Sequence, residues 1–276
     1  FVERVGDPVP LVAQDGSAHR GDVLTATALE AMARTADDGR PTGTVAVAVP
    51  AHWGPATIGA LRGALRSIPT LSPGGTAPLI VSDATAALAA LQSDPGLPDR
   101  GVVALCDFGA AGSSITLADA GADFAIIGET VRYADFSGDH ADQALLNHIL
   151  SGIRTASPTE TGGTAAVGSL MRLREECRLA KERLSAETTA VVPADLPGYR
   201  SDVRVTRAEL ESLLSEPFTG FLDALGDALE RSGIPAANLS AVATVGGSAA
   251  IPFVTQRLSE QLRVPVITTA RPDLAA

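Results

Sequence analysis

The sequence predicts an α/β protein, and two observations support this class. Short apolar runs, which favour strands, alternate with segments in which apolar residues recur every three or four positions, as in helices. The chain has 276 residues, of which 45% are hydrophobic and 19% charged, as in ordinary globular proteins, so a largely disordered chain is excluded. This length suffices for one large domain or two smaller ones.

The first half of the chain predicts alternating helices and strands after an irregular start. Residues 1–21 predict no regular element beyond a turn at Asp15-Gly16. A helix is expected from about Gly21, and its expected apolar face comprises Leu24, Ala28, Leu29 and Met32. The remaining expectations are a buried strand at 44–49, a helix over 58–65, a strand at 78–81 and a helix at 84–91.

After a loop at 93–101, the second half predicts three strands joined by short turns. The apolar runs at 102–106, 114–117 and 124–131 are separated by glycine-rich turns, which is typical of an antiparallel meander. Helices are expected at 139–150 and 167–184. The second of these helices has a regular apolar stripe of Leu170, Leu173, Cys177, Ala180 and Leu184.

The end of the chain contains the clearest helix signal. Strands are expected at 189–192 and 202–205, and Thr206 with Glu209 forms a capping box that begins a long helix. This helix should end near Gly233. The last expected elements are a strand at 241–245, a helix at 251–262 and a strand at 264–267.

The charge and the cysteines exclude several classes of protein. Thirty-two acidic residues against 21 basic ones give a net charge of −11, so we expect no nucleic-acid partner. Lys181 is the only lysine, so chemistry that needs a lysine depends on it. Cys106 and Cys177 fit neither a disulfide framework nor a metal site, and we expect reduced thiols. No apolar run is long enough to span a membrane and no signal peptide is visible, so a cytoplasmic protein is expected.

Three loops present small residues directly after apolar runs, at 107–113, 137–139 and 246–248. Glycine lets backbone N–H groups approach a phosphate closely, and a loop that enters a helix adds the positive end of the helix dipole. An acidic residue at a strand end, such as Asp107, can hold a hydrated Mg²⁺ or orient a water. A loop of this kind is more often an ordinary turn. Only the order and spacing of the three loops favour a role in binding phosphate.

Other motif families do not match. Asp107-Phe108-Gly109 has the letters of the kinase magnesium triplet, but the chain has no catalytic-loop HRD, no P-loop GxxxxGK and no GxSxG elbow. His140 and His148 lie two turns apart on one expected helix, which favours solvated histidines over a metal site.

Six segments, in order, resemble the nucleotide-binding domain of Hsp70. Val49-Pro50-Ala51-His52-Trp53 resembles VPAYF, residues 82–87 resemble NEPTAA and Asp107-Phe108-Gly109 resembles the second phosphate loop, DLGGGTFD. Residues 136–139 resemble LGGED, residues 172–185 resemble the adenine-side helix RLRxxCExAKRxLS, and residues 245–252 resemble the adenosine loop VGGSTRIP.

The resemblance implies the actin-like ATPase (ribonuclease H-like) fold, in which two lobes bind Mg-ATP between them. The first strands of lobe I, with the first phosphate loop DLGTT, are expected to be absent from this chain. Residues 1–97 would then be the remainder of lobe I and 98–268 lobe II, with a peripheral subdomain at about 137–205. Residues 269–276 would return to lobe I.

The resemblance also implies the site. Asp107 and Asp83 would be vestigial catalytic residues, and Asp107 would hold Mg²⁺ through water. The residues implied for binding ATP or ADP are Gly109, Gly112, Gly138, Lys181, Ser185, Gly246, Gly247 and Ser248.

The departures from the family pattern concern catalysis and the adenine side. Val2 or Glu3 stands where the family has its catalytic lysine. The second phosphate loop has Ala110, Ala111, Gly112 and Ser114 in place of two glycines, a threonine and an aspartate. On the adenine side, Arg178 replaces a glutamate, Glu182 an arginine and Ala250 an arginine.

These departures predict a pseudo-ATPase with weak or lost nucleotide binding that works through a protein partner. The alternative is a slow Mg-dependent ATPase that acts as a chaperone-like switch. Residues 1–11 and the composition also resemble actinobacterial Hsp70-like proteins associated with type VII secretion.

Overall fold

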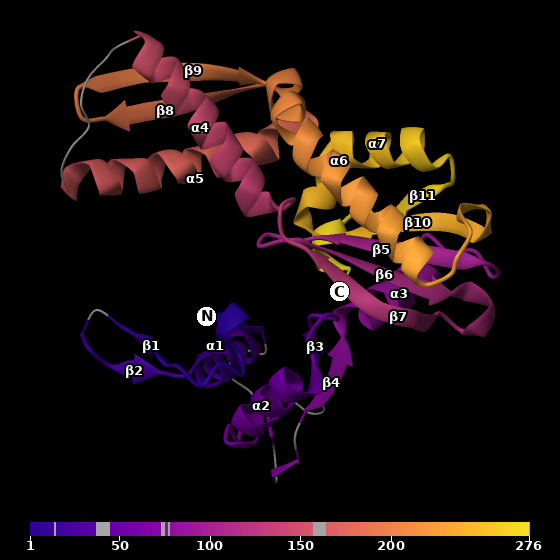
Figure 1. The fold of residues 1–276 in the computed structure, drawn as a ribbon. Helices are drawn as coiled ribbons and strands as arrows, with labels where there is room; N and C mark the ends of the chain where they lie inside the picture. Colours follow the sequence, from indigo (N-terminus) through magenta and orange to yellow (C-terminus); the bar gives the residue numbers. More distant parts are fainter. Residues whose placement is uncertain (14, 37–44, 73–74, 77, 157–163, 276) are drawn as a thin grey trace. The chain divides into compact units, whose positions relative to one another are not determined.

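The computed structural model describes residues 1–13, 15–36, 45–72, 75–76, 78–156 and 164–275 (Figure 1). They form two compact units, Phe1–Ala86 and Ala87–Ala276, which are treated separately below. The lobe boundaries expected from the sequence remain predictions. No helix within the described ranges is both long and apolar enough to span a bilayer.

Unit 1 is built on a two-stranded parallel sheet. Its elements are a short hairpin of β1 (Leu11–Val12) and β2 (Ala18–His19), then α1 (Gly21–Ala36), β3 (Ala46–Val49), α2 (Pro55–Arg66) and β4 (Leu79–Ser82). The β3 and β4 strands pair in parallel from Ala46 opposite Leu79 to Val49 opposite Ser82. Leu61 and Leu65 of α2 are fully buried against Val47 and Val49, as their helical spacing predicts.

Two expectations for unit 1 need correction. The predicted apolar face of α1 is only partly right: Leu29 packs against the core, but Met32 is 67% exposed, and Asp22, Thr25 and Ala26 are buried instead. Gly21 lies against the backbone of Arg4, and this close approach turns the small residues of the helix inward. The β1–β2 hairpin was not predicted, because its two-residue strands are mostly exposed and leave no apolar alternation.

Other edges of unit 1 differ only slightly from expectation. The strand expected at 44–49 is observed at Ala46–Val49, and residue 44 lies outside the described residues.

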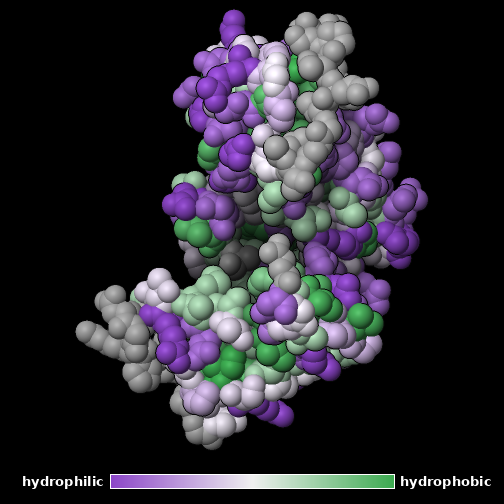
Figure 2. Space-filling view, turned by 90° about the vertical axis from the view of Figure 1, so that its left-hand side faces the viewer, coloured by the Kyte–Doolittle hydropathy of each residue, from purple (hydrophilic) through white to green (hydrophobic). Residues whose placement is uncertain are grey.

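Figure 2 shows apolar residues scattered among polar ones on the face that it displays, and scattered apolar side chains are normal for protein surfaces.

Unit 2 has a mixed five-stranded sheet in the order β11-β10-β5-β6-β7. Its strands are β5 (Val102–Phe108), β6 (Ser113–Asp119), β7 (Ala125–Tyr133), β10 (Leu239–Val245) and β11 (Val266–Thr268). The predicted antiparallel meander is confirmed for β5, β6 and β7, whereas β10 pairs in parallel with β5 and with β11. The parallel pairing brings Asp107 of β5 opposite Val245 of β10, so the loops that follow both strands lie at one edge of the sheet.

Helices and a second hairpin complete unit 2 (Figure 1). They are α3 (Asp83–Ser93), which begins in unit 1, α4 (Gly138–Ala156), α5 (Thr164–Ala186), the hairpin of β8 (Thr189–Leu196) and β9 (Tyr199–Thr206), α6 (Arg207–Arg231) and α7 (Pro252–Leu262). The stripe predicted on α5 is confirmed, because four of its five residues are fully buried and Leu170 packs partly buried against them.

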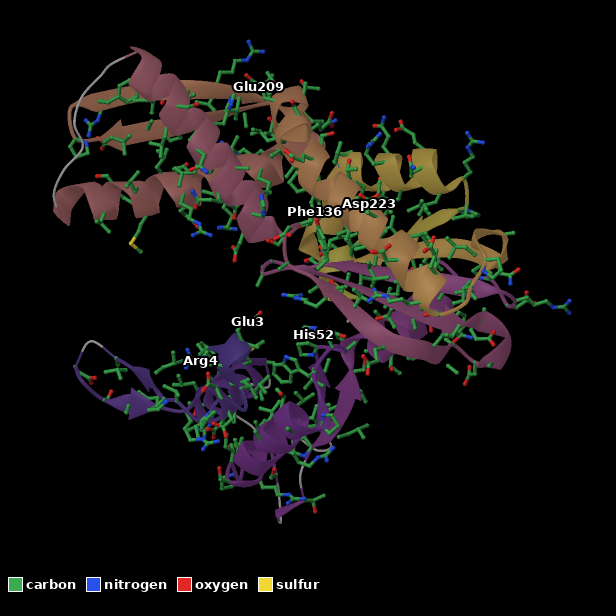
Figure 3. All side chains as sticks on the ribbon, in the orientation of Figure 1. Glu3, Arg4, His52, Phe136, Glu209 and Asp223 are labelled. Atoms are coloured by element: carbon green, nitrogen blue, oxygen red, sulfur yellow. The ribbon has the colours of Figure 1, made fainter. Side chains whose placement is uncertain are left out.

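The core of unit 2 contains a cluster of phenylalanines that fixes the start of α4 relative to the sheet. Phe108 ends β5, Phe136 precedes α4 (Figure 3), and Phe218 and Phe221 lie on α6; all four are buried. Ring centroids in the cluster lie 4.8 to 6.4 Å apart. Both cysteines are free and buried, as expected.

Candidate functional site

The largest group of predicted binding residues lies around one cavity of unit 2. The cavity measures about 410 Å³, and its walls come from the β5–β6 loop, the start of α4, one face of α5 and the 3₁₀ turn Gly247–Ala250. Five of the eight residues predicted to bind nucleotide line it: Gly138, Lys181, Ser185, Gly247 and Ser248. The cavity therefore unites segments that are far apart in the sequence.

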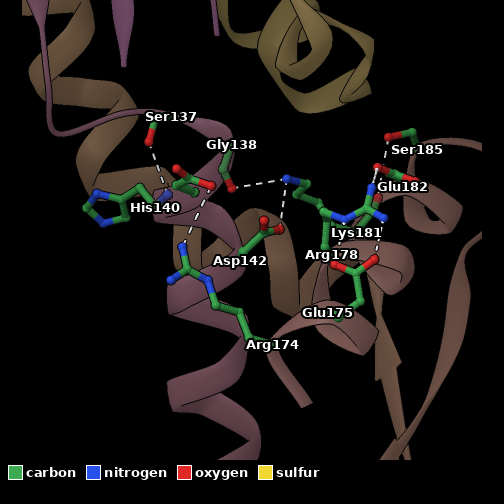
Figure 4. A network of polar contacts seen from close by, with 11 residues as sticks. Ser137, Gly138, His140, Asp142, Arg174, Glu175, Arg178, Lys181, Glu182 and Ser185 are labelled. Carbon is green, nitrogen blue, oxygen red and sulfur yellow. Dashed lines mark hydrogen bonds and ion pairs between the residues drawn. The ribbon is translucent and has the colours of Figure 1, made fainter. Parts of the chain in front are cut away.

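Lys181 is held by a buried carboxylate on the neighbouring helix (Figure 4). Its Nζ atom lies 2.8 Å from Oδ1 of Asp142 and donates a hydrogen bond of 3.0 Å to the carbonyl oxygen of Gly138. The side chains of Lys181 and Asp142 are only 12% and 5% exposed. A buried charge is costly unless it is paired, so this contact fixes α5 against the start of α4.

The β5–β6 loop is tied to the start of α4 by its backbone. The N–H of Gly138 donates to the carbonyl of Gly109 at 3.0 Å, and the N–H of Asp139 donates to that of Ala110 at 2.8 Å. A Cβ on Gly138 would come within 3.2 Å of Ser248 Oγ and 3.4 Å of Lys181 Nζ. Glycine is therefore the residue that leaves room between these polar groups.

Gly246 turns the chain sharply out of β10 and packs against the end of β5. Its backbone has φ +87° and ψ 156°, a region that essentially only glycine adopts. A Cβ there would lie 2.5 Å from both Asp107 Oδ1 and the carbonyl oxygen of Phe108. Gly246 thus borders Asp107, whereas a Cβ on Gly247 would meet no atom within 4 Å and the cavity is open at that position.

Arg178 and Glu182, where the family has the opposite charges, form an ion pair on the wall of the cavity. Arg178 Nη1 lies 2.5 Å from Glu182 Oε1, and Arg178 Nη2 lies 2.5 Å from Glu175 Oε1. Hydrogen bonding to Glu175 and the charge of Glu182 raise the pKa of Arg178, and the guanidinium lowers the pKa of Glu175. Because these groups are about half exposed, the network adds little stability, and it pairs the Arg178 charge with two carboxylates.

Of the remaining predicted residues, Gly109 and Gly112 lie in the β5–β6 loop, and Asp83 lies in unit 1. Gly109 and Gly112 close the β5–β6 turn, in which the Gly109 N–H donates to the Gly112 carbonyl at 3.1 Å. Asp83 belongs to unit 1, where its carboxylate accepts hydrogen bonds from the N–H groups of Ala51 at 2.8 Å and Ala84 at 2.6 Å.

The described residues contain no cluster of three histidine, cysteine or acidic side chains that could hold a metal ion. Asp107 therefore offers a single carboxylate at the end of β5. This fits a Mg²⁺ that keeps most of its waters and is held mainly by phosphate oxygens, and it does not fit an all-protein metal site.

Asp142 was missed in the sequence. It lies on the apolar face of α4 beside Ala141, Leu145 and Leu146, where an acidic residue needs a partner. Lys181, on the similarly apolar face of α5, also needs a partner of opposite charge. An acidic and a basic residue on two apolar helix faces were therefore the signal that could have identified Asp142.

The chain is similar in sequence to known proteins of one family. A sequence model described as "Hsp70 protein" matches residues 3–276. A heat shock cognate HSP70 protein of Trypanosoma brucei brucei is 30% identical over 203 residues, which are 71% of this chain and 30% of that protein. A chaperone protein HscA homolog of Acidithiobacillus ferrooxidans is 27% identical over 237 residues, 85% of this chain and 36% of that protein.

A third relative is a heat shock protein of Pyricularia oryzae, with 28% identity over 185 residues, 66% of this chain and 30% of that protein. The chain thus spans about a third of the length of the curated relatives that it matches. The mixed α/β architecture is consistent with the actin-like ATPase fold. Since the family match covers nearly every residue, the chain belongs to the Hsp70 family.

Proposed function

We propose that this chain is a nucleotide-binding pseudo-ATPase, which retains adenine nucleotide in the unit 2 cavity without hydrolysing it. The observation that carries the proposal is the Lys181–Asp142 pair at the edge of the space between Gly138 and Ser248. An ammonium has three donors, and one of them is used by the Gly138 carbonyl, while the ion pair with Asp142 offsets its charge. A remaining donor is suited to a ribose hydroxyl oxygen.

The size and chemistry of the cavity support binding of the nucleoside. Its volume of about 410 Å³ falls within the range of small-molecule pockets. Ala250 and Ile251 supply apolar surface on one side and Ser185 a hydroxyl on the other. Glu182 and Ala250 replace two family arginines beside the base, which supports an affinity weaker than is typical of the family.

The residues of the phosphate side support loss of hydrolysis. Phosphoryl transfer depends almost entirely on positioning and charge neutralisation. Removing one well-placed electrostatic group costs on the order of 10² to 10³ in rate. Here Val2 or Glu3 stands in place of the family lysine, and Gly112 and Ser114 stand in place of a threonine and an aspartate of the second phosphate loop.

A protein that binds nucleotide without turnover acts through its partners, and we propose that this chain does so. Relatives are named chaperones, among them a ribosome-associated molecular chaperone of Zygosaccharomyces rouxii. The faint similarity of residues 1–11 to type VII secretion-associated proteins makes a secretion component one partner to test. The alternative, a slow Mg-dependent ATPase, is favoured by the retained Asp107 at the end of β5.

A single-turnover assay separates the two functions. The protein, in excess over radiolabelled ATP and with Mg²⁺, is incubated for hours, and bound nucleotide and released phosphate are measured together. Bound ATP that stays intact supports the pseudo-ATPase. Release of phosphate that is abolished by Asp107→Asn supports the slow ATPase and contradicts the proposal.

A further inference from the structure

Arg132 of β7 lies against the second phosphate loop, although no sequence motif assigns it a role. Its guanidinium occupies the space beside Gly112, where a Cβ would come within 2.6 Å of Cζ and Nη2 and 2.8 Å of Nε. A side chain at residue 112 would therefore displace the Arg132 guanidinium from the loop. The contact joins the third strand of the meander to the loop between the first two.

The strand register puts Arg132 on the same face of the sheet as the acidic end of β5. Arg132 is paired with Ser114 of β6, and Ser114 is paired in turn with Asp107 of β5. Residues directly opposite each other in antiparallel strands project from the same face. Asp107, Ser114 and Arg132 thus form a cross-strand row beside the loop, with the acid and the base at its two ends.

The loop itself presents backbone donors. Within the described residues, the N–H groups of Ala110 and Ala111 donate to no backbone carbonyl, and both residues are exposed. Ala110 also lines the cavity, and Gly112 follows two residues later, which is at most about 7 Å of chain. A phosphate chain that leaves the cavity at Ala110 therefore arrives beside the Arg132 guanidinium.

Two bases that line the cavity, Lys181 and Arg178, come from α5 on the nucleoside side, and Arg174 lies on the same helix. Lys181 is paired with Asp142 at 2.8 Å, Arg178 lies between Glu175 and Glu182, and Arg174 lies 3.7 Å from Asp139. Arg132 comes instead from the sheet, on the phosphate side. Its planar fork of donors suits two phosphate oxygens at once.

We propose that Arg132 is a phosphate-binding residue of this chain, which supplies positive charge to the β- and γ-phosphates at the 109–112 loop. This inference rests on the proposed nucleotide binding. The guanidinium takes over part of the neutralising role of a lysine that the first six residues lack. It binds phosphate without positioning a water, so it supports retention of nucleotide and not its hydrolysis.

The test compares the affinities of ATP, ADP and adenosine for the full chain and for Arg132→Gln. We expect the variant to bind ADP and ATP about 10- to 100-fold more weakly while adenosine affinity changes less than about twofold. Arg132→Lys, which keeps the charge but loses the fork, should recover part of the loss. Arg200→Gln is the matched control, because Arg200 is an exposed arginine in the β8–β9 hairpin, paired only with Asp195 among the described residues.

The outcomes separate the two proposals. Equal ADP affinities for the wild-type protein and Arg132→Gln overturn the role of Arg132 while the nucleotide site stands. Parallel losses for adenosine and ADP indicate a structural role and also overturn it. A wild-type protein that binds neither adenosine nor ADP removes the nucleotide function, and the Arg132 proposal with it. Circular dichroism melting of each variant shows that it is folded.

Discussion

The Nζ atom of Lys181 and the Oδ1 atom of Asp142 lie 2.8 Å apart between α5 and α4, and both side chains are almost completely buried. This pair joins the two helices at the wall of the cavity, and Lys181 also binds the Gly138 carbonyl at the first residue of α4. The sole lysine of the chain therefore supports the fold and the candidate site at the same time.

Breaking this pair should destabilise the protein strongly. Lys181→Met leaves the Asp142 carboxylate buried without its cation, and we expect the free energy of unfolding to fall by about 3–5 kcal/mol. The double variant Lys181→Met/Asp142→Leu should regain most of that loss, because no charge is left buried. Urea unfolding followed by circular dichroism measures both values. A loss below about 1 kcal/mol in the single variant would show that the pair is unimportant.

Gly246→Ala should be much more damaging than a substitution at another glycine with positive φ. The new Cβ would lie 2.5 Å from Asp107 Oδ1 and from the Phe108 carbonyl, in a backbone conformation reserved for glycine. Gly233→Ala is the matched control, because φ is +65° there and a Cβ meets nothing within 4 Å. We expect a melting temperature clearly lower for Gly246→Ala than for Gly233→Ala, and equal values would contradict the close packing of the loop.

Much of the fold followed from apolar patterns that are local in the sequence. The capping box at Thr206 and Glu209 is present, with both reciprocal hydrogen bonds, because its signal lies within one turn. The stripe on α5 and the apolar run of β5 are likewise buried as expected. The inward face of α1 was predicted only in part, because the burial of Asp22, Thr25 and Ala26 goes with the close approach of Gly21 to Arg4, which is a tertiary contact.

The candidate site was predictable only in part. Gly138, Gly246 and Gly247 could be predicted, because loops that need a glycine for backbone conformation or close approach show it in the sequence. The only trace of Asp142 was an acidic residue on an apolar helix face, and Arg132 left none. Their roles depend on which residues face each other between α4 and α5 and between β6 and β7, and the sequence predicted neither of these registers.

The stability of the start of α6 should depend on pH through Glu209 (Figure 3). Hydrogen bonds from Thr206 lower the pKa of Glu209 in the folded protein below its unfolded value. Its stabilising contribution is therefore complete above about pH 4.3 and is lost as the pH falls through the lowered pKa. Glu209→Gln keeps the capping geometry and should reduce the change in melting temperature between pH 6 and pH 3. An unchanged difference would contradict this role.

Both cysteines should be unreactive in the folded protein. Burial raises the pKa of Cys177 to about 12, and burial also raises that of Cys106 far above its usual value. Because the thiolate is the reactive form, we expect no alkylation by iodoacetamide at pH 8 until the protein is unfolded in urea, where both residues react. Mass spectrometry of the intact chain counts the adducts. Rapid labelling of Cys177 under native conditions would show that α5 does not pack as described.

The central claim is that the cavity bounded by Gly138, Lys181 and Gly247 binds an adenine nucleotide. Calorimetric titration of ADP with Mg²⁺ into the full chain tests it most directly, with Gly247→Trp as the variant that fills the open wall of the cavity without a backbone clash. The account predicts saturable binding by the wild-type protein that Gly247→Trp abolishes. Absence of heat at millimolar ADP, or equal binding by the two proteins, would contradict it.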